Sequence, residues 1–281
     1  MMREVSYEEI VNSVKELCVE ANYNLGKDVL DAFKSAYKNE ESDVGKEVLN
    51  QLVLNAEIAG QERVPMCQDT GMAIFFVALG QDCHIVGGSL YDAINEGVRQ
   101  GYREGYLRAS IVEDPLQRKN TGDNTPAIIH LELVKGDRCT IHMTAKGFGS
   151  ENMSRLKMLK PSDGVKGVTE FILETVKLAG PNACPPIVVG VGLGGNFEKA
   201  GILAKKSLLR PIGERHPRKE IADLEQELME KINHLGIGPQ GMGGRTTALD
   251  VHIEVFATHI AALPVAVNIN CHASRHKTAN L

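Results

Sequence analysis

Six cysteines occur in this chain of 281 residues, and three of them stand where a thiolate could bind a metal ion. Cys67, Cys184 and Cys271 lie in the turn-rich sequences PMCQDTG, GPNACPP and NINCHASRH. Loops of this kind keep a thiolate accessible and offer backbone N–H groups to it. The other three lie in or beside apolar segments, where a buried and inert thiol is the simpler interpretation: Cys18, Cys83 and Cys139.

The number and spacing of the three loop cysteines limit the metal chemistry. The chain has no CxxC pair, which disfavours a zinc ribbon and a ferredoxin-like cluster. The three cysteines are 117 and 87 residues apart, so only the fold could bring them together. A cubane iron–sulfur cluster with three cysteine ligands would leave one iron open as a Lewis acid for a substrate hydroxyl and carboxylate. Spacing alone leaves this as one hypothesis.

The elements that must position these residues begin with helices. Ser6 and Glu9 have the form of a capping box, and apolar residues follow at helical spacing as far as Cys18. Periodic segments at 29–37 and 44–58 extend the helical region over about residues 1–60. Later helices are predicted at 89–102, 165–178, 197–209 and 219–235.

Strands are predicted between these helices. AIFFVAL (73–79) is a short apolar run, and segments 128–134 and 139–143, joined by a Lys-Gly-Asp turn, predict a β-hairpin. PPIVVGVGLGGN (185–196) predicts a strand and then a glycine loop, and 248–270 is β-like with an interruption near 261–264. Because strict βαβ alternation is absent, we expect one α+β domain over residues 1–281. Its helical N-terminal part would precede a mixed sheet and Gly-rich loops around a buried cluster site.

The composition is that of an ordinary globular protein. There are 31 Lys+Arg and 36 Asp+Glu residues, a formal charge of −5, and 43% of the residues are hydrophobic. The mildly acidic balance argues against nucleic acid and anionic lipid as partners. The sequence contains no apolar run near the ~18 residues that would span a membrane. Since the N-terminus also lacks the apolar core of a signal peptide, we expect a cytoplasmic protein.

Seven motifs carry a resemblance to a known family. They are CQDTG (67–71), LRASIVEDPLQRKNTGDNTPA (107–127), AKGFGSEN (145–152), ACPP (183–186), GVGLGGNFEKA (190–200), GIGPQGMGG (236–244) and INCHASRH (269–276). On these motifs the chain resembles the alpha subunit, or N-terminal domain, of the class I iron–sulfur fumarate hydratases. It is also similar to the alpha subunit of the L(+)-tartrate dehydratases. The motifs run from about residue 60 to the last few residues, so the resemblance covers most of the chain.

The resemblance implies a set of ligands and site residues. A [4Fe-4S] cluster would have three cysteine ligands, Cys67, Cys184 and Cys271, and one open iron that binds substrate. Gln68 and Asp69 would lie at the substrate, and Arg108 would pair with a substrate carboxylate, for which its forked guanidinium is suited. The AKGFGSEN loop would add part of the pocket through Gly147, Ser150, Glu151 and Asn152.

A family histidine twelve residues before the third cysteine falls on His259. With Asp69 it would form a catalytic pair for proton transfer, with His259 as the hydrogen-bond partner of the carboxylate. Judged from the residues alone, His259 lies in an apolar strand, where a satisfied core histidine is the competing interpretation. Arg108 alone would be read as a solvated charge.

The activity implied is the reversible hydration of fumarate to (S)-malate, a hydro-lyase reaction of the tricarboxylic acid cycle, with a small dicarboxylate as substrate. In the family, a second polypeptide or domain supplies further arginines, a lysine and a threonine. The sequence ends ten residues after Cys271. We therefore expect a separate beta subunit in an α2β2 heterotetramer.

Three alternatives stay open at this point. The chain could be the alpha subunit of an L(+)-tartrate dehydratase, with the same chemistry on a substrate that has one more hydroxyl. It could be a non-catalytic iron–sulfur binding protein. GVGLGG (190–195) fits the GxGxxG pattern of a nucleotide-dependent oxidoreductase, although no strand ending in an acidic residue follows at the usual distance.

Overall fold

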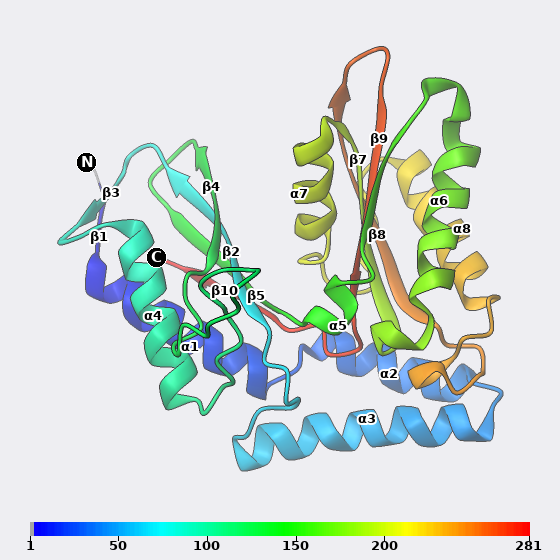
Figure 1. Ribbon diagram of the computed structural model, residues 1–281, viewed down its shortest axis with the longest axis horizontal. Coiled ribbons are helices and arrows are strands. Elements are labelled where there is room, and N and C mark those ends of the chain that lie inside the picture. Colours follow the sequence, from blue (N-terminus) through cyan, green and yellow to red (C-terminus); the bar gives the residue numbers. More distant parts are fainter. Residues whose placement is uncertain (1–2) are drawn as a thin grey trace. The chain divides into compact units, whose positions relative to one another are not determined.

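The computed structural model describes residues 3–281, whose contacts group them into two compact units (Figure 1). Unit 1 consists of residues 3–25, 55–148 and 275–281, and unit 2 of residues 26–54 and 149–274. Each unit combines helices with a mixed four-stranded sheet, which confirms the predicted α+β class. The single domain expected from the sequence stays a prediction, and the units are described one at a time.

Unit 1 is built on a four-stranded sheet in the order β10-β5-β2-β4. Its strands are β2 (Met72–Gly80), β4 (Ile128–Val134), β5 (Cys139–Lys146) and β10 (His276–Asn280). The predicted hairpin of β4 and β5 is wrong, because β2 lies between them, parallel to β4 and antiparallel to β5. The reason is burial: β2 is the most apolar of these strands and takes an interior position, whereas the more exposed β4 forms an edge.

One face of this sheet packs on two helices, α1 (Tyr7–Tyr23) and α4 (Leu90–Glu104). The predicted capping box starts α1: the Ser6 N–H donates to Glu9 Oε2 at 2.8 Å, and the Glu9 N–H donates to Ser6 Oγ at 3.2 Å. Cys18 and Cys139 are fully buried in this core, as predicted, and burial raises the pKa of the Cys139 thiol to about 11. Two short parallel strands, β1 (Arg3–Ser6) and β3 (Cys83–Val86), complete the unit.

Unit 2 holds a second four-stranded sheet, in the order β6-β9-β7-β8. Its strands are β6 (Arg155–Leu159), β7 (Ile187–Gly195), β8 (Ala248–Thr258) and β9 (Leu263–Asn270). Helices α6 (Gly164–Ala179) and α8 (Lys219–Asn233) cover one face, and α7 (Phe197–Ser207) covers the other (Figure 1). Helix α2 (Lys27–Asn39) contacts β8.

The remaining elements are short or lie where the chain passes from one unit to the other. Helix α3 (Asp43–Glu62) contains the boundary at Leu54, and helix α5 (Phe148–Glu151) contains the boundary at Phe148. Three 3-10 helices belong to unit 2: η1 (Pro161–Asp163), η2 (Gly180–Ala183) and η3 (Pro239–Gly241). No helix within residues 3–281 combines the length and the apolar character needed to cross a membrane.

The GVGLGG sequence is strand, not the glycine loop predicted. Gly190 and Gly192 lie within β7 and face α7. A Cβ on Gly192 would lie 2.0 Å from the Ala200 carbonyl oxygen, and one on Gly190 would lie 2.2 Å from that of Ala204. These glycines therefore allow a helix to rest directly on the strand. The GxGxxG pattern that suggested nucleotide binding therefore allows α7 to pack on β7.

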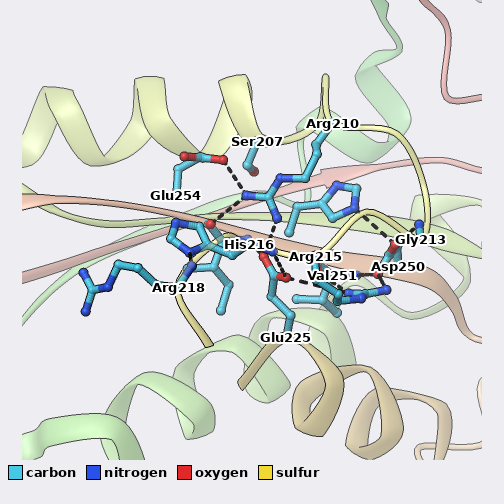
Figure 2. A network of polar contacts seen from close by, with 12 residues as sticks. Ser207, Arg210, Gly213, Arg215, His216, Arg218, Glu225, Asp250, Val251 and Glu254 are labelled. Carbon is cyan, nitrogen blue, oxygen red and sulfur yellow. Dashed lines mark hydrogen bonds and ion pairs between the residues drawn. The ribbon is translucent and has the colours of Figure 1, made fainter. Parts of the chain in front are cut away.

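The free edge of β8 is closed by side chains instead of another strand (Figure 2). The Arg210 guanidinium donates to the Ile253 carbonyl oxygen at 3.0 Å, and the Ile253 N–H donates to Glu225 Oε1 at 2.8 Å. Arg215 donates to the Val251 carbonyl oxygen at 3.3 Å. Arg210 and Glu225 also form an ion pair at 2.6 Å, with the Glu225 side chain fully buried. The network thus satisfies backbone groups that an edge strand leaves open.

Candidate active site

In unit 1 the candidate site is the loop Cys67–Gly71, which leads into β2. The Tyr102 hydroxyl lies 3.0 and 3.1 Å from the carbonyl oxygens of Thr70 and Gly71, and Asn124 Nδ2 donates to the Gly71 carbonyl at 3.2 Å. The Arg108 N–H donates to Thr70 Oγ1 at 2.9 Å. The loop is therefore held by α4 and by the long polar segment that follows it.

Backbone N–H groups hold both carboxylate oxygens of Asp69. Its Oδ1 accepts the Gly71 N–H at 3.0 Å, and its Oδ2 accepts the Phe148 N–H at 2.9 Å. Its backbone carbonyl accepts a hydrogen bond from the buried Arg275 at 2.7 Å. A Cβ on Gly147 would lie 3.2 Å from Arg275 Nη2 and 3.4 Å from Asp69 Oδ2, so this buried glycine lets the backbone approach both side chains closely. The structure thus brings Asp69 and Gly147 together.

Arg108 and Gln68 project from the same region. The Arg108 side chain is exposed and forms no ion pair with any residue that the structure describes, although its backbone is tied to Thr70. Gln68 is exposed, and its Oε1 lies 3.4 Å from the half-buried Cys67 thiol. The region therefore offers an exposed guanidinium that can bind an anionic substrate and an oriented carboxylate that can exchange a proton.

In unit 2 the structure brings Cys184 and Cys271 together. Cys184 precedes β7 and Cys271 follows β9, and these antiparallel neighbours pair Val188 with Asn270. The N–H of His272 donates to the Cys184 carbonyl at 3.2 Å. Cys184 has a left-handed backbone (φ 53°, ψ 64°), which a residue with a side chain adopts only at a cost of about 1 kcal/mol or more.

The second half of AKGFGSEN also lies in unit 2, whereas Gly147 lies in unit 1. Ser150 is buried and Asn152 is exposed. Glu151 forms an ion pair with Lys205 and accepts a hydrogen bond from Asn268 Nδ2 at 3.0 Å. Burial lowers the pKa of the Lys205 ammonium, although the Glu151 carboxylate opposes that shift. The Glu151 carboxylate is therefore already engaged within unit 2.

His259 lies in an exposed turn between β8 and β9, not in an apolar strand, so the interpretation as a core histidine is wrong. Its Nδ1 accepts the Ala261 N–H at 3.2 Å. The eight residues of β9 separate this turn from Cys271, a span of roughly 25 Å for an extended strand. The structure therefore does not bring His259 to the end of the sheet that carries Cys184 and Cys271. Its catalytic pairing with Asp69 stays a prediction.

The chemistry of the three loop thiols fits an iron–sulfur cluster. Cys67, Cys184 and Cys271 are half-buried, unlike the fully buried Cys18, whose thiol pKa is raised by burial. Accessible soft thiolates are the donors that such clusters use. Over the described residues 3–281, no three His, Cys, Asp or Glu side chains form a group that could hold a single metal ion. Cys67 belongs to unit 1, and the other two belong to unit 2.

Comparison with known proteins identifies the family. The model of the family described as Fumarate hydratase (Fumerase) matches residues 11–280. The chain belongs to this family. It is thereby one of the hydro-lyases, enzymes that add water to a double bond or remove it.

Two relatives match along nearly their whole lengths. The chain is 48% identical to the "Putative L(+)-tartrate dehydratase subunit alpha" of Methanocaldococcus jannaschii, over 95% of each chain. It is 36% identical to the L(+)-tartrate dehydratase subunit alpha of Escherichia coli strain K12, over 99% of this chain and 94% of the relative.

Several residues that shape these loops did not stand out in the sequence. Asn124, Gln240 and Arg275 lie inside three of the seven motifs, and that was the signal that could have singled them out. Tyr102 looks like one more apolar position of an amphipathic helix, yet its hydroxyl reaches the Thr70 and Gly71 carbonyls. A side chain that holds a loop distant in sequence leaves no recognisable pattern among its sequence neighbours.

Proposed function

We propose that this chain is the alpha subunit of an iron–sulfur hydro-lyase that reversibly hydrates fumarate to (S)-malate. The observation that carries the proposal is the Asp69 carboxylate, two residues from Cys67 and held by the N–H groups of Gly71 and Phe148. The backbone N–H of Arg108, a residue with an exposed side chain, donates to Thr70 Oγ1 of the same loop. Membership of the fumarate hydratase family supports this reaction.

Cys67, Cys184 and Cys271 would hold a [4Fe-4S] cluster with one open iron, which supplies Lewis-acid chemistry for a substrate hydroxyl when bound. Arg108 would bind a substrate carboxylate through two parallel N–H bonds. Gly147 would contribute its backbone to the pocket, close to Asp69.

Asp69 is suited to moving a proton. Each of its carboxylate oxygens accepts one backbone N–H, at 3.0 Å for Oδ1 and 2.9 Å for Oδ2. A carboxylate oxygen has two lone pairs, so each oxygen keeps one for a proton from water or substrate. The same N–H bonds fix the plane of the carboxylate, so that the proton is delivered in one direction.

A separate beta subunit would complete the enzyme, in an α2β2 assembly. The relatives that match over nearly full length are named as alpha subunits, which supports a partner chain. In this proposal the partner supplies the cations for the second carboxylate and the base on the carbon side. Gln68 and Ser150–Asn152 would line the pocket.

L(+)-tartrate is the second candidate substrate, favoured by the names of the same relatives. Dehydration of L(+)-tartrate is the same elimination of water, from a dicarboxylate with one more hydroxyl. The residues that recognise the extra hydroxyl would lie on the partner chain, so substrate choice would depend on that part of the pocket.

The experiment is steady-state kinetics of the co-expressed, anaerobically purified alpha and beta chains with fumarate, (S)-malate and L-tartrate. We expect turnover of fumarate and malate, and an increase in KM of about 10-fold or more in Arg108→Ala, from loss of a charged hydrogen bond. Arg103→Ala, which removes an exposed arginine of α4, is the matched control and should leave KM unchanged. Turnover of tartrate alone would select the second candidate. A complex that holds a cluster but turns over none of the three would instead favour a non-catalytic iron–sulfur protein.

A further inference from the structure

The loop 236–244, GIGPQGMGG, lies beside the Cys184–Cys271 end of unit 2 and has no role in the proposed reaction. Its central side chain is Gln240. The Gln240 backbone N–H donates to the Pro185 carbonyl at 2.6 Å, and Nε2 of the side chain donates to the same oxygen at 2.7 Å. Nε2 also lies 3.1 Å from His272 Nδ1.

Gln240 therefore contacts the residue that follows Cys184 and the residue that follows Cys271. An amide nitrogen has two hydrogens, and these two neighbours account for both. His272 is bound to the Cys184 segment as well, since its backbone N–H and its Nδ1 lie 3.2 and 3.1 Å from the Cys184 carbonyl oxygen. Its Nδ1 accepts from Gln240 in one tautomer and donates to Cys184 in the other, and both tautomers join the two cysteine segments.

The loop is shaped to present this side chain. Gln240 has a left-handed backbone (φ 50°), which costs free energy in any residue but glycine. Gly241 packs so closely on η2 that a Cβ would lie 2.3 Å from Pro181 Cβ. Just beyond the loop, the backbone N–H groups of Arg245 and Thr246 are bound by the buried Glu40 carboxylate, each at 2.8 Å. The chain is thus anchored at Gly241 and again at Arg245 and Thr246, on the C-terminal side of Gln240.

We propose that Gln240 is a positioning residue that holds the Cys184 and Cys271 segments at the separation a cluster requires. This inference rests on the proposed function, because the contacts of Gln240 have this purpose only if Cys184 and Cys271 are cluster ligands. Cys184 has a left-handed backbone, so a contact that holds its segment in place opposes relaxation of that strained conformation. A cluster with three protein ligands is sensitive to the loss of any one of them. The rate of cluster release therefore measures how firmly Gln240 holds the two cysteine segments.

The experiment measures the rate at which the anaerobic alpha–beta holoenzyme loses its visible cluster absorbance to an excess of an iron chelator. Gln240→Ala removes both donated side-chain bonds, and Gln240→Glu keeps the size of the side chain while replacing the donor by an acceptor. The matched control is Gln226→Ala, on the exposed face of α8, where the side chain donates a hydrogen bond to Glu230. We expect cluster loss to be about 10-fold faster in both Gln240 variants, and within about 2-fold of wild type in the control.

Two further measurements separate positioning from general stability. Hydrogen exchange of the apoprotein should show lower protection of the His272 amide in both Gln240 variants, because its bond to Cys184 is loosened. The urea midpoint for unfolding should change no more than in Gln226→Ala. If Gln240→Ala does not fold, the isosteric Gln240→Glu carries the comparison.

The outcomes distinguish this inference from the function on which it rests. A wild-type complex that binds no cluster contradicts the proposed function. A wild-type complex with a normal cluster, but Gln240 variants that release it as slowly as the control, overturns the positioning role alone. Faster release that only follows a matching loss of urea midpoint also overturns it, because Gln240 would then be a general packing residue.

Discussion

Glu40 offers a stability test that can be worked out from the structure. It follows α2 with 2% of its surface exposed, and its carboxylate accepts the backbone N–H groups of Arg245 and Thr246, each at 2.8 Å. The N–H groups of Glu41 and Ser42 add contacts at 2.9 and 3.1 Å. Burial alone would raise the pKa of this carboxyl, but the hydrogen bonds outweigh it and lower the pKa from 4.5 to about 2.

The sign of the pH dependence follows from that direction. A carboxyl whose pKa is lower in the folded state stabilises the protein at pH values above its unfolded pKa of 4.5. The stabilisation is lost as the pH falls from 4.5 toward 2. At about 1.4 kcal/mol per pH unit, the difference corresponds to about 3 kcal/mol of unfolding free energy at neutral pH.

The substitution is Glu40→Gln, which keeps the size of the side chain and removes its charge. Urea unfolding at a series of pH values from 7 to 3 should show a loss of about 3 kcal/mol at neutral pH that shrinks as the solution becomes acidic. Glu41→Gln is the control, since Glu41 is exposed and makes one surface ion pair with Arg245, worth less than about 1 kcal/mol. A Glu40→Gln loss that is constant with pH, or below about 1 kcal/mol at neutral pH, would refute the reasoning.

Three other predictions follow from single contacts. Glu225→Ala leaves Arg210 without its buried partner and should lower the unfolding free energy by about 3–5 kcal/mol in urea titrations; a loss below about 1 kcal/mol would contradict the network of Figure 2. Gly192→Ala places a Cβ 2.0 Å from the Ala200 carbonyl oxygen and should lower the free energy of unfolding by about 1–3 kcal/mol. Gly201→Ala on α7, where the nearest atom is 3.9 Å from the new Cβ, should be neutral or stabilising. Equal effects of the two substitutions would argue against the strand–helix contact. Asp69→Asn should lower kcat at least about 100-fold in the anaerobic complex while its iron content stays at the wild-type value; undiminished turnover would remove Asp69 from the mechanism.

Elements whose signals are local could be predicted from the sequence. The capping box of Ser6 and Glu9, the apolar strand β2 and the helices α4, α6, α7 and α8 all depend on residues close together in the chain. The hairpin was wrong because a turn at 135–137 specifies neighbouring strands only when no third strand competes for the place between them. Burial places β2 between these strands through contacts that are distant in sequence, and the turn residues give no indication of it.

The candidate site divides in the same way. The motif around Asp69 pointed to a loop, and the structure adds the long-range partners Phe148 and Arg275 that orient it. Two features stayed out of reach of the sequence. GVGLGG looks like a phosphate loop until α7 is seen resting on Gly190 and Gly192. His259 precedes Cys271 by twelve residues, but the eight-residue strand β9 places the two residues at opposite ends of the sheet.

Iron and sulfide analysis of the anaerobically purified complex shows whether the three loop cysteines hold a cluster. We expect about four iron ions per alpha chain and a broad visible absorbance in the wild type. Cys67→Ser, Cys184→Ser and Cys271→Ser should each lose that absorbance, while Cys83→Ser, at a half-buried cysteine of β3 outside these loops, should keep it. A Cys184→Ser complex that stays brown with full iron content would contradict the account.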